Sequence, residues 1–402
     1  MKKLRKITEQ IVKLLLTVNG GVTSLAILLI IVFLFKEGLG LFKNPSVEKG
    51  YVLCVNSANN VERLSSYEIK QIFDWKTTDW NEIGGNAGTI APFRFEEIFS
   101  LYSDEELGED YSLLPEKLGE VIAKDINIIA YIPQEFFPQN NNAVKILTSE
   151  NIRFSDFFGG TEWLPTTTPS PQFGVFPLIL GTLWISLFAI LIALPLGVGV
   201  AVYLSELASE RVRKILKPAI ELLAGIPSVV YGFFGLVVLV PLVQRTFNLP
   251  VGETAFTGSL ILAIMALPTI ITIAEDAMRN TPRAMREASL ALGATHWQTI
   301  YKVIIPYSSS GIMAAIVLGI GRAIGETMAV LMVTGNAAVI PSSLFQPIRT
   351  IPATIAAELG EAPVGGAHYQ SLFLLGSILF IITMIISISA EFISRRRQSK
   401  GI

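Results

Sequence analysis

The chain has 402 residues, of which 51% are hydrophobic and only 16% are charged. Because soluble domains carry about 25% charged residues, this composition excludes an ordinary soluble enzyme and indicates a membrane protein. The formal net charge of −2 argues against a nucleic-acid-binding protein, and a single cysteine, Cys54, excludes an intrachain disulfide framework and a cysteine-based zinc site.

Six stretches are long and apolar enough to cross a bilayer as helices. Crossing the roughly 30 Å hydrocarbon core takes about 20 apolar residues, since every backbone amide there must be paired. The predicted spans are Val18–Phe35, Phe176–Leu204, Ala219–Val243, Gly258–Ala274, Ser309–Thr334 and Ser371–Ile393. In the third span, Ala224-Gly-Ile-Pro-Ser228 predicts a bend. We expect an all-α polytopic membrane protein with six transmembrane helices, embedded in the lipid bilayer.

The first span (18–35) follows a basic N-terminal segment, so a cleaved secretory signal is one reading of it. Its apolar run is longer than that of a signal peptide, and no small-residue cleavage site follows it at Phe33–Glu37. We therefore expect a retained signal anchor that precedes the remaining five helices.

Basic residues are distributed unequally between the two sides of the predicted membrane. Seventeen Lys and Arg lie in four segments on one side, namely 1–17, 205–217, 276–308 and 394–402. The short loops on the other side, 244–257 and 336–370, hold only Arg245 and Arg349. Because cytoplasmic loops carry the excess of Lys and Arg, both termini (1–17 and 394–402) are predicted to lie in the cytoplasm, with the chain in the cytoplasmic (inner) membrane.

Residues 36–172 form an insert of different composition between the first two spans. The insert has 11 Lys and Arg against 21 Asp and Glu, and in this topology it faces the outside. Its predicted elements are strands at Tyr51–Asn56 and Asn127–Ile132 and amphipathic helices at Ser65–Phe73 and Pro115–Ala123. Ser65 or Ser66 is the expected N-cap of the first helix, with Glu68 close behind. The pattern favours a small folded α/β domain.

The loop 276–308, between the fourth and fifth spans, carries the most informative pattern. A helix from Arg283 to Leu292 is too polar at Arg286 and Glu287 to enter lipid, and Gly293 supplies a left-handed stop. A second short helix is expected to follow. A short helix with an exposed Ala-rich face at the membrane surface is suited to docking into a groove of a partner, and the alternative is a surface helix with no partner.

The same loop resembles the signature loop of ABC importer permeases, Glu-Ala-Ala-x3-Gly-x9-Ile-x-Leu-Pro. Here it runs from Glu287-Ala-Ser through Gly293 to Val303-Ile-Ile-Pro306, with mild departures at Ser289, Val303 and Ile305. In that family the loop is the coupling helix that fits into the ATPase subunit. The resemblance therefore implies a coupling role for Arg286, Glu287, Ala288, Ser289 and Gly293.

The chain contains no Gly-x4-Gly-Lys-Ser/Thr motif, the loop that would hold ATP phosphates. The ATP-binding subunit is thus expected to be a separate chain, and this chain is expected to be a transport subunit without enzyme activity, metal or cofactor.

Further stretches look like the C-type permease of bacterial phosphate ABC importers, a branch of the binding-protein-dependent ABC permease family. They are Gly181–Leu183, Ala193–Gly197, Glu221–Gly235, Ala266–Ile270, Gly319–Val330 and Arg349–Glu361. The resemblance covers about residues 1–44 and 153–402 and implies an ABC permease core of five helices at 173–393. It also implies a second homologous permease subunit and an extracytoplasmic phosphate-binding protein as partners.

Arg322 and Glu326 lie inside the fifth predicted span, where each charge costs about 2.5–3.5 kcal/mol. Their i, i+4 spacing would place them on one helix face, so they can pair or jointly face a polar path. The planar guanidinium can donate two parallel hydrogen bonds to a tetrahedral oxyanion. We hypothesise that Arg322 lines the phosphate path and that Glu326 holds or balances it; the alternative is a structural ion pair.

Part of the insert resembles phosphate-binding proteins, at Leu64–Gly85 followed by Thr89–Arg94 and at the later strands Asn127–Pro133 and Val144–Thr148. About 100 residues make one lobe of such a protein and not two. We expect one α/β lobe that helps to dock or guide the separate binding protein, or else a folded spacer. Its acidity disfavours capture of an anion by the insert itself.

The sequence thus favours a permease subunit of an ATP-driven phosphate importer. Two alternatives stay open, a permease for another oxyanion such as molybdate or sulfate, and an ion-coupled secondary transporter that uses Arg322 and Glu326 for proton coupling. A membrane enzyme has little support, because no nucleophile elbow, zinc motif or carboxylate cluster occurs in the spans.

Overall fold

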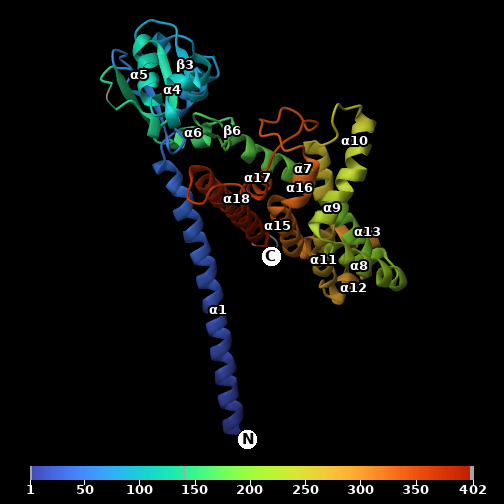
Figure 1. Cartoon of the computed structure of the whole chain (residues 1–402). Coiled ribbons are helices and arrows are strands. Elements are labelled where there is room, and N and C mark those ends of the chain that lie inside the picture. Colours follow the sequence, from blue (N-terminus) through green and yellow to red (C-terminus); the bar gives the residue numbers. More distant parts are fainter. Residues whose placement is uncertain (1, 140, 399–402) are drawn as a thin grey trace. The chain divides into compact units, whose positions relative to one another are not determined.

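The computed structural model describes residues 2–139 and 141–398, and the chain divides into two compact units. The transmembrane unit comprises residues 1–35, 177–362 and 372–402, and the insert unit comprises residues 36–176 and 363–371. Figure 1 colours both units along the sequence. All strands of the described residues belong to the insert unit.

Helices build the transmembrane unit. They are α1 (Lys2–Gly38), α7 (Phe176–Val202), α8 (Glu210–Ala224), α9 (Ser228–Phe234), α10 (Val240–Phe247), α11 (Ala255–Arg279), α12 (Arg283–Ala291), α13 (His296–Thr299), α14 (Ile305–Tyr307), α15 (Ser309–Gly325), α16 (Met328–Val333), α17 (Ile351–Glu358) and α18 (Ala367–Gln398). The π-helical turns η6 (Tyr203–Leu207), η7 (Gly235–Leu239) and η8 (Ile300–Ile304) join some of them. Five helical stretches of the described chain could cross a membrane, or six if a bent pair counts as one span. The predicted polytopic fold is confirmed.

The third span begins later than the sequence predicted. Residues 219–224 belong to α8, and the spanning stretch is Ser228–Phe247, after a break at Gly225–Pro227. Glycine is a poor helix former and proline has no amide hydrogen to donate, and α8 ends at Ala224, directly before Gly225 and Pro227. The predicted bend is confirmed, but the predicted start of the span was wrong because the amphipathic α8 forms a helix of its own.

The fifth span is not the continuous helix 309–334 that the sequence predicted. Helix α15 ends at Gly325, Glu326 has extended backbone angles (φ −71°, ψ 131°), and α16 begins at Met328. Upstream, the helical stretch His296–Tyr307 meets Ser309–Gly325 at 69°. The predicted start at Ser309 agrees with the start of α15, whereas the break at Glu326 was missed because apolar residues continue on both sides of it.

The helices of the transmembrane unit approach closely at glycines. Ile270 of α11 packs between Gly197 of α7 and Gly319 of α15. A Cβ atom at Gly197 would lie 2.7 Å from Ile270 Cγ2, and one at Gly319 would lie 2.8 Å from Ile270 Cγ1. Small residues at these two positions therefore allow the three helices to pack.

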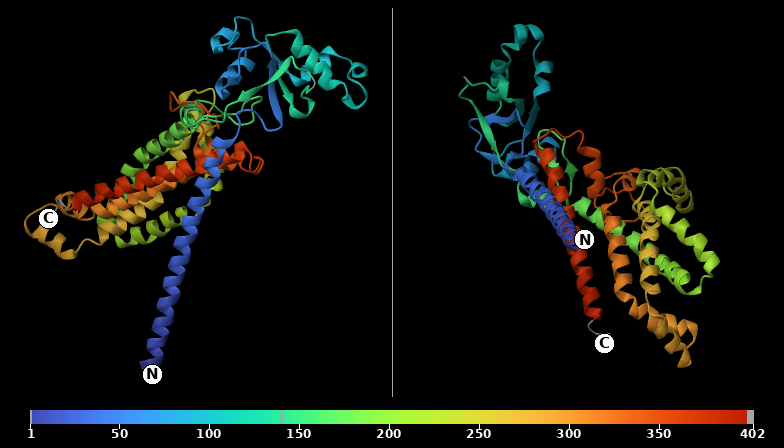
Figure 2. Two further views of the ribbon diagram at one scale, coloured as in Figure 1. Left: turned by 90° about the vertical axis from the view of Figure 1, so that its left-hand side faces the viewer. Right: turned by 90° about the horizontal axis from the view of Figure 1, so that it is seen from below.

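Helix α1 exposes its apolar residues. Every residue from Val12 to Ile30 is exposed within the chain. Near the C-terminal end of α1, the ring of Phe33 packs edge-on against Phe373 of α18, with 5.4 Å between centroids. Figure 2 shows this end of α1, in blue, beside α18, in red. A bilayer or a partner helix is the natural cover for such a surface, because water would solvate it poorly.

A five-stranded mixed sheet forms the centre of the insert unit, in the order β2-β5-β1-β4-β3. The strands are β1 (Tyr51–Asn56), β2 (Arg63–Leu64), β3 (Ala91–Arg94), β4 (Ile128–Pro133) and β5 (Val144–Ser149), and β6 (Trp163–Leu164) pairs separately with β7 (Gln172–Phe173). Central β1 pairs antiparallel with β4 and β5, with Cys54 opposite Ala130 and Ile146. The outer strands β3 and β2 join in parallel.

Helices and turns complete the insert unit. They are α2 (Ser66–Phe73), α3 (Ile98–Leu101), α4 (Asp104–Leu107), α5 (Leu114–Lys124) and α6 (Phe154–Gly159), with 3₁₀ turns η1 (Leu39–Lys43), η2 (Trp80–Ile83), η3 (Phe95–Glu97), η4 (Glu109–Tyr111) and η5 (Gln134–Phe136).

Two hydrophobic clusters cover the two faces of the sheet. Alternate residues of β1 point to opposite faces, so Leu53 packs with Ile69 of α2 while Cys54 packs with Leu118 of α5. The N-cap of α2 is Ser65, whose hydroxyl accepts from the Glu68 amide while the Glu68 carboxylate accepts from the Ser65 amide. The predicted strands, helices and capping box of the insert are confirmed.

Candidate coupling surface and substrate path

Helix α12 ends where the sequence placed a stop. It runs from Arg283 to Ala291 after Pro282, and Gly293 follows with φ +83°. Residues with a side chain rarely adopt this left-handed conformation, whereas glycine adopts it without steric cost. The turn lets the chain reverse into α13, so α12 forms a short separate segment outside the spans.

Helix α13 begins with its own cap. The hydroxyl of Thr295 accepts from the Gln298 amide, and the Gln298 side chain accepts from the Thr295 amide at 2.9 Å. The hydroxyls of Ser289 on α12 and Thr299 lie 3.0 Å apart. This bond holds the two short helices together as one segment, which we call the coupling segment (residues 282–299).

The five residues predicted for coupling lie together on this segment but face different ways. Arg286 holds the segment to the rest of the unit, Ser289 is half-buried and bonds to Thr299 within the segment, and Glu287 and Ala288 are exposed. Gly293 forms the turn. The set therefore divides into side chains that position the segment and side chains that are free to meet a partner.

Apolar side chains extend from the coupling segment into solvent. Leu292 is 89% exposed, Trp297 61% and Leu290 46%. In Figure 1, α12 and α13 lie with α8 at one end of the transmembrane unit. Exposed apolar residues gathered on a segment too polar for lipid are typical of a protein interface.

Arg286 connects three elements of the unit. Its Nη2 donates to the Met278 carbonyl of α11 at 3.0 Å and lies 2.9 Å from Oε1 of Glu206, in the turn η6 that ends α7. The Glu206 side chain is 4% exposed, and His296 Nε2 lies 3.3 Å from the Glu206 carbonyl. The sequence motifs did not indicate a role for Glu206. Its position as an acidic residue just after the predicted span Phe176–Leu204 was the one signal that could have pointed to it.

Arg322 and Glu326 do not form the arrangement that their spacing predicted. Glu326 lies beyond the end of α15, so the i, i+4 geometry of a helix does not apply to it. Arg322 Nη1 donates to Thr269 Oγ1 of α11 at 3.2 Å, and Glu326 Oε1 accepts from the Thr327 amide at 3.1 Å. Within residues 2–139 and 141–398, no ion pair joins the two charges. Both side chains are half-buried.

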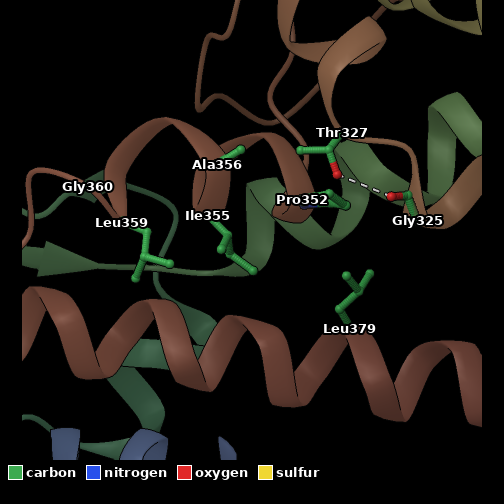
Figure 3. A pocket seen from close by; sticks show the side chains of 8 residues that line it. All are labelled: Gly325, Thr327, Pro352, Ile355, Ala356, Leu359, Gly360 and Leu379. Carbon is green, nitrogen blue, oxygen red and sulfur yellow. Dashed lines mark hydrogen bonds between the residues drawn. The ribbon is translucent and has the colours of Figure 1, made fainter. Parts of the chain in front are cut away.

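An apolar groove of about 500 Å³ lies beside the break in the fifth span (Figure 3). It is lined by Gly325, Thr327, Pro352, Ile355, Ala356, Leu359, Gly360 and Leu379. Figure 3 shows Ile355 and Leu359 on one side and Leu379 of α18 opposite them, with Thr327 Oγ1 donating to the Gly325 carbonyl at 3.2 Å. Because this lining offers an anion no charged donor, the groove does not suit an oxyanion.

The chain is similar in sequence to known transport proteins. The family described as "Binding-protein-dependent transport system inner membrane component" matches residues 193–399. A phosphate transport system permease protein, PstC of Mesorhizobium japonicum, is 42% identical over 263 residues, which cover 61% of this chain and 79% of the relative. A probable ABC transporter permease protein of Bacillus subtilis, YqgH, is 40% identical over 243 residues, which cover 60% and 78%.

A solved structure of an inward-facing methionine ABC transporter, MetNI, covers 56% of this chain and 94% of the matched chain, at 19% identity and a TM-score of 0.42. The similarity to phosphate importer permeases that the motifs indicated is confirmed by the curated relatives. The chain belongs to the family of binding-protein-dependent transport system inner membrane components, the permease subunits of ABC importers.

Proposed function

We propose that this chain is the permease subunit of an ATP-driven importer that moves inorganic phosphate into the cell. The 42% identity to a phosphate transport permease, over 79% of that protein, is the observation that carries the choice of phosphate. An extracytoplasmic phosphate-binding protein delivers the anion, a second homologous permease completes the path, and both termini are cytoplasmic.

A separate ATP-binding subunit docks on the coupling segment. Supporting this, the segment is short, its helix α12 lies outside the spans, and it exposes Leu290, Leu292 and Trp297. A partner groove can gain about 25 cal/mol of stabilisation per Å² of apolar surface that it buries. Glu287 and Ala288 lie on the exposed part of the segment, where they contact the partner. Gly293 sets the direction in which the segment is presented.

Arg322 lines the path of the anion, and Glu326 balances its charge. Arg322 is bonded to the neutral hydroxyl of Thr269 and not to a carboxylate, so its guanidinium keeps donors for phosphate oxygens. Glu326, at the break between α15 and α16, lies one residue beyond α15. Since the two charges are not paired, a passing anion can compete for Arg322 without first displacing a carboxylate.

The acidic insert, predicted at 36–172, guides the binding protein to the membrane part. Residues 36–172 carry 21 Asp and Glu against 11 Lys and Arg, and like charge disfavours a phosphate site on the insert itself. One sheet of five strands covered on both faces is a single lobe, so a two-lobed clamp needs a separate protein.

Uptake of radiolabelled phosphate tests the proposal. The chain is reconstituted in liposomes with its ATP-binding subunit, second permease and loaded binding protein, and we expect uptake that requires ATP hydrolysis. Arg322→Gln should reduce uptake at least tenfold, at equal protein in the membrane, because it removes the cation from the path. The matched control is Arg245→Gln, at an exposed arginine of α10, which should retain uptake.

Each competing function has its own outcome in that assay. Uptake driven by a proton gradient without ATP would mean a secondary transporter. ATP-dependent uptake of molybdate or sulfate in preference to phosphate would mean a different oxyanion. Full phosphate uptake by Arg322→Gln would reject the role given to Arg322.

A further inference from the structure

Glu275 is a carboxylate held by three cations near the end of α11. Its side chain is only 1% exposed. Oε1 accepts from Arg213 Nε at 3.0 Å, and the Arg213 Nη2 lies 2.9 Å from it. Oε2 accepts from Lys217 Nζ at 2.6 Å, and Arg279 Nη1 lies 3.7 Å from Oε1. A buried carboxylate is costly unless it is paired, and here the cations come mostly from another helix.

Those partners are the means by which α8 is attached to α11. Arg213 and Lys217 are four residues apart and lie on one face of α8. No side chain of α8 is fully buried in this chain, and Ile215 and Leu222 are more than 70% exposed. Apolar packing within the chain therefore holds α8 weakly, and the bonds to the buried Glu275, with a further bond from Lys217 to the more exposed Asp276 at 2.7 Å, set its position against α11.

Glu275 also lies next to the coupling segment. It is four residues before Arg279, the last residue of α11, and α12 starts at Arg283. Arg286 of α12 donates back to the Met278 carbonyl, in the same last turn of α11. A displacement of the coupling segment therefore acts on the end of α11 that carries Glu275.

The opposite end of α8 leads toward the proposed substrate path. Across the break at Gly225–Pro227, Tyr231 of α9 donates through its hydroxyl to the Leu223 carbonyl of α8 at 2.8 Å. In α9, a Cβ atom at Gly232 would lie 2.7 Å from Met332 Sδ of α16. Helix α16 begins two residues after Glu326, so direct contacts through α9 connect α8 to the break in the fifth span.

We propose that Glu275 is a positioning residue that makes α8 move with the coupling segment, so that force from the ATPase reaches α9 and α16. This inference rests on the proposed function, since it assigns a route to the force that an ATP-binding subunit would apply. A purely structural ion pair between α8 and α11 would stabilise the fold, but its loss would not change the number of ATP molecules hydrolysed per anion transported.

The ratio of ATP hydrolysed to phosphate transported tests this route in the complete reconstituted importer. Glu275→Gln keeps the size of the side chain and removes the charge that holds Arg213 and one of the two carboxylates that hold Lys217, the other being the half-exposed Asp276 at 2.7 Å. We expect ATP hydrolysis to continue, phosphate uptake to fall, and the ratio to rise about fivefold or more, as expected for the loss of a typical coupling free energy. Glu221→Gln is the matched control, an exposed carboxylate on α8, and should leave the ratio unchanged.

A second variant covers the case in which Glu275→Gln does not accumulate in the membrane. Combining it with Arg213→Gln and Lys217→Gln removes the same connection without leaving those two cations unpaired, so membrane abundance should recover while the ratio stays high. A wild-type ratio in either variant overturns the inference. If the wild-type importer itself shows no ATP-dependent phosphate uptake, the proposed function has failed, which is a different result.

Discussion

Arg286 and Glu206 join the coupling segment to the end of the second span, with 2.9 Å between Nη2 and Oε1. They are 80 residues apart in the sequence, and the arginine also donates to the Met278 carbonyl. One guanidinium thus contacts two different spans from a helix that lies outside both. The position of the coupling segment depends on this contact.

Replacing Arg286 should loosen that segment. Arg286→Gln leaves the carboxylate of Glu206 buried without a cation, and because Arg286 is a quarter exposed we expect a loss of about 1–3 kcal/mol, below the range for a fully buried pair. The midpoint of thermal unfolding in detergent measures this loss. The double variant Arg286→Gln with Glu206→Gln should unfold at a higher temperature than the single variant, because no charge is left unpaired.

Arg283→Gln serves as the control for that measurement, since Arg283 is exposed on the same helix. An equal loss of stability in Arg283→Gln and Arg286→Gln would show that the contact with Glu206 contributes nothing.

The effect of replacing Gly293 should depend on how readily the new residue adopts a positive φ, and not on the size of its side chain. An added Cβ would meet nothing within 4 Å, but φ is +83°, which costs a β-branched residue about 1–2 kcal/mol or more. Gly293→Val should therefore weaken copurification of the ATP-binding subunit, and Gly293→Asn should retain most of it, because asparagine enters this region more readily.

Gly199→Ala is the corresponding control, in α7, where there is also open space but φ is not positive. Equal copurification by Gly293→Val and Gly199→Ala would contradict a requirement for the left-handed turn.

The Cys54 thiol should not be labelled by thiol reagents while the protein is folded. The side chain is fully buried, and burial raises the pKa of the thiol to about 12, so at pH 7–8 almost none is the reactive thiolate. Maleimide should therefore label the wild-type chain only after denaturation, as detected by a gel shift. Rapid labelling of the native chain would mean that the sheet of the insert opens readily.

Because Cys54 is not expected to react in the folded chain, a single introduced cysteine can report on the proposed interface. Leu292→Cys should react quickly with maleimide in the isolated permease, because residue 292 is 89% exposed. Adding the ATP-binding subunit should slow that reaction about tenfold or more, whereas a cysteine replacing the exposed Val364, outside the coupling segment, should react at an unchanged rate. Undiminished labelling of Leu292→Cys in the complex would place the docking surface elsewhere.

Local signals in the sequence predict two of the features described above. The stop at Gly293 follows from one residue type in a helical context, and the cap formed by Ser65 and Glu68 follows from a spacing of three. In contrast, the shared helix face that the spacing of Arg322 and Glu326 predicted does not form, because α15 does not continue past Gly325. An apolar pattern records burial in the bilayer and contains no information on where a helix breaks.

The amino-acid sequence by itself determined the membrane class, the family and the position of the short helix α12 with its stop at Gly293, because these depend on composition, on apolar runs and on motifs of neighbouring residues. Only the tertiary structure decided which charges meet. Glu275 pairs with Arg213 and Lys217, about 60 residues earlier, and Arg322 bonds to Thr269 instead of Glu326. Such partners are chosen when helices pack and a buried charge must find a counterpart within reach, whatever the separation along the chain.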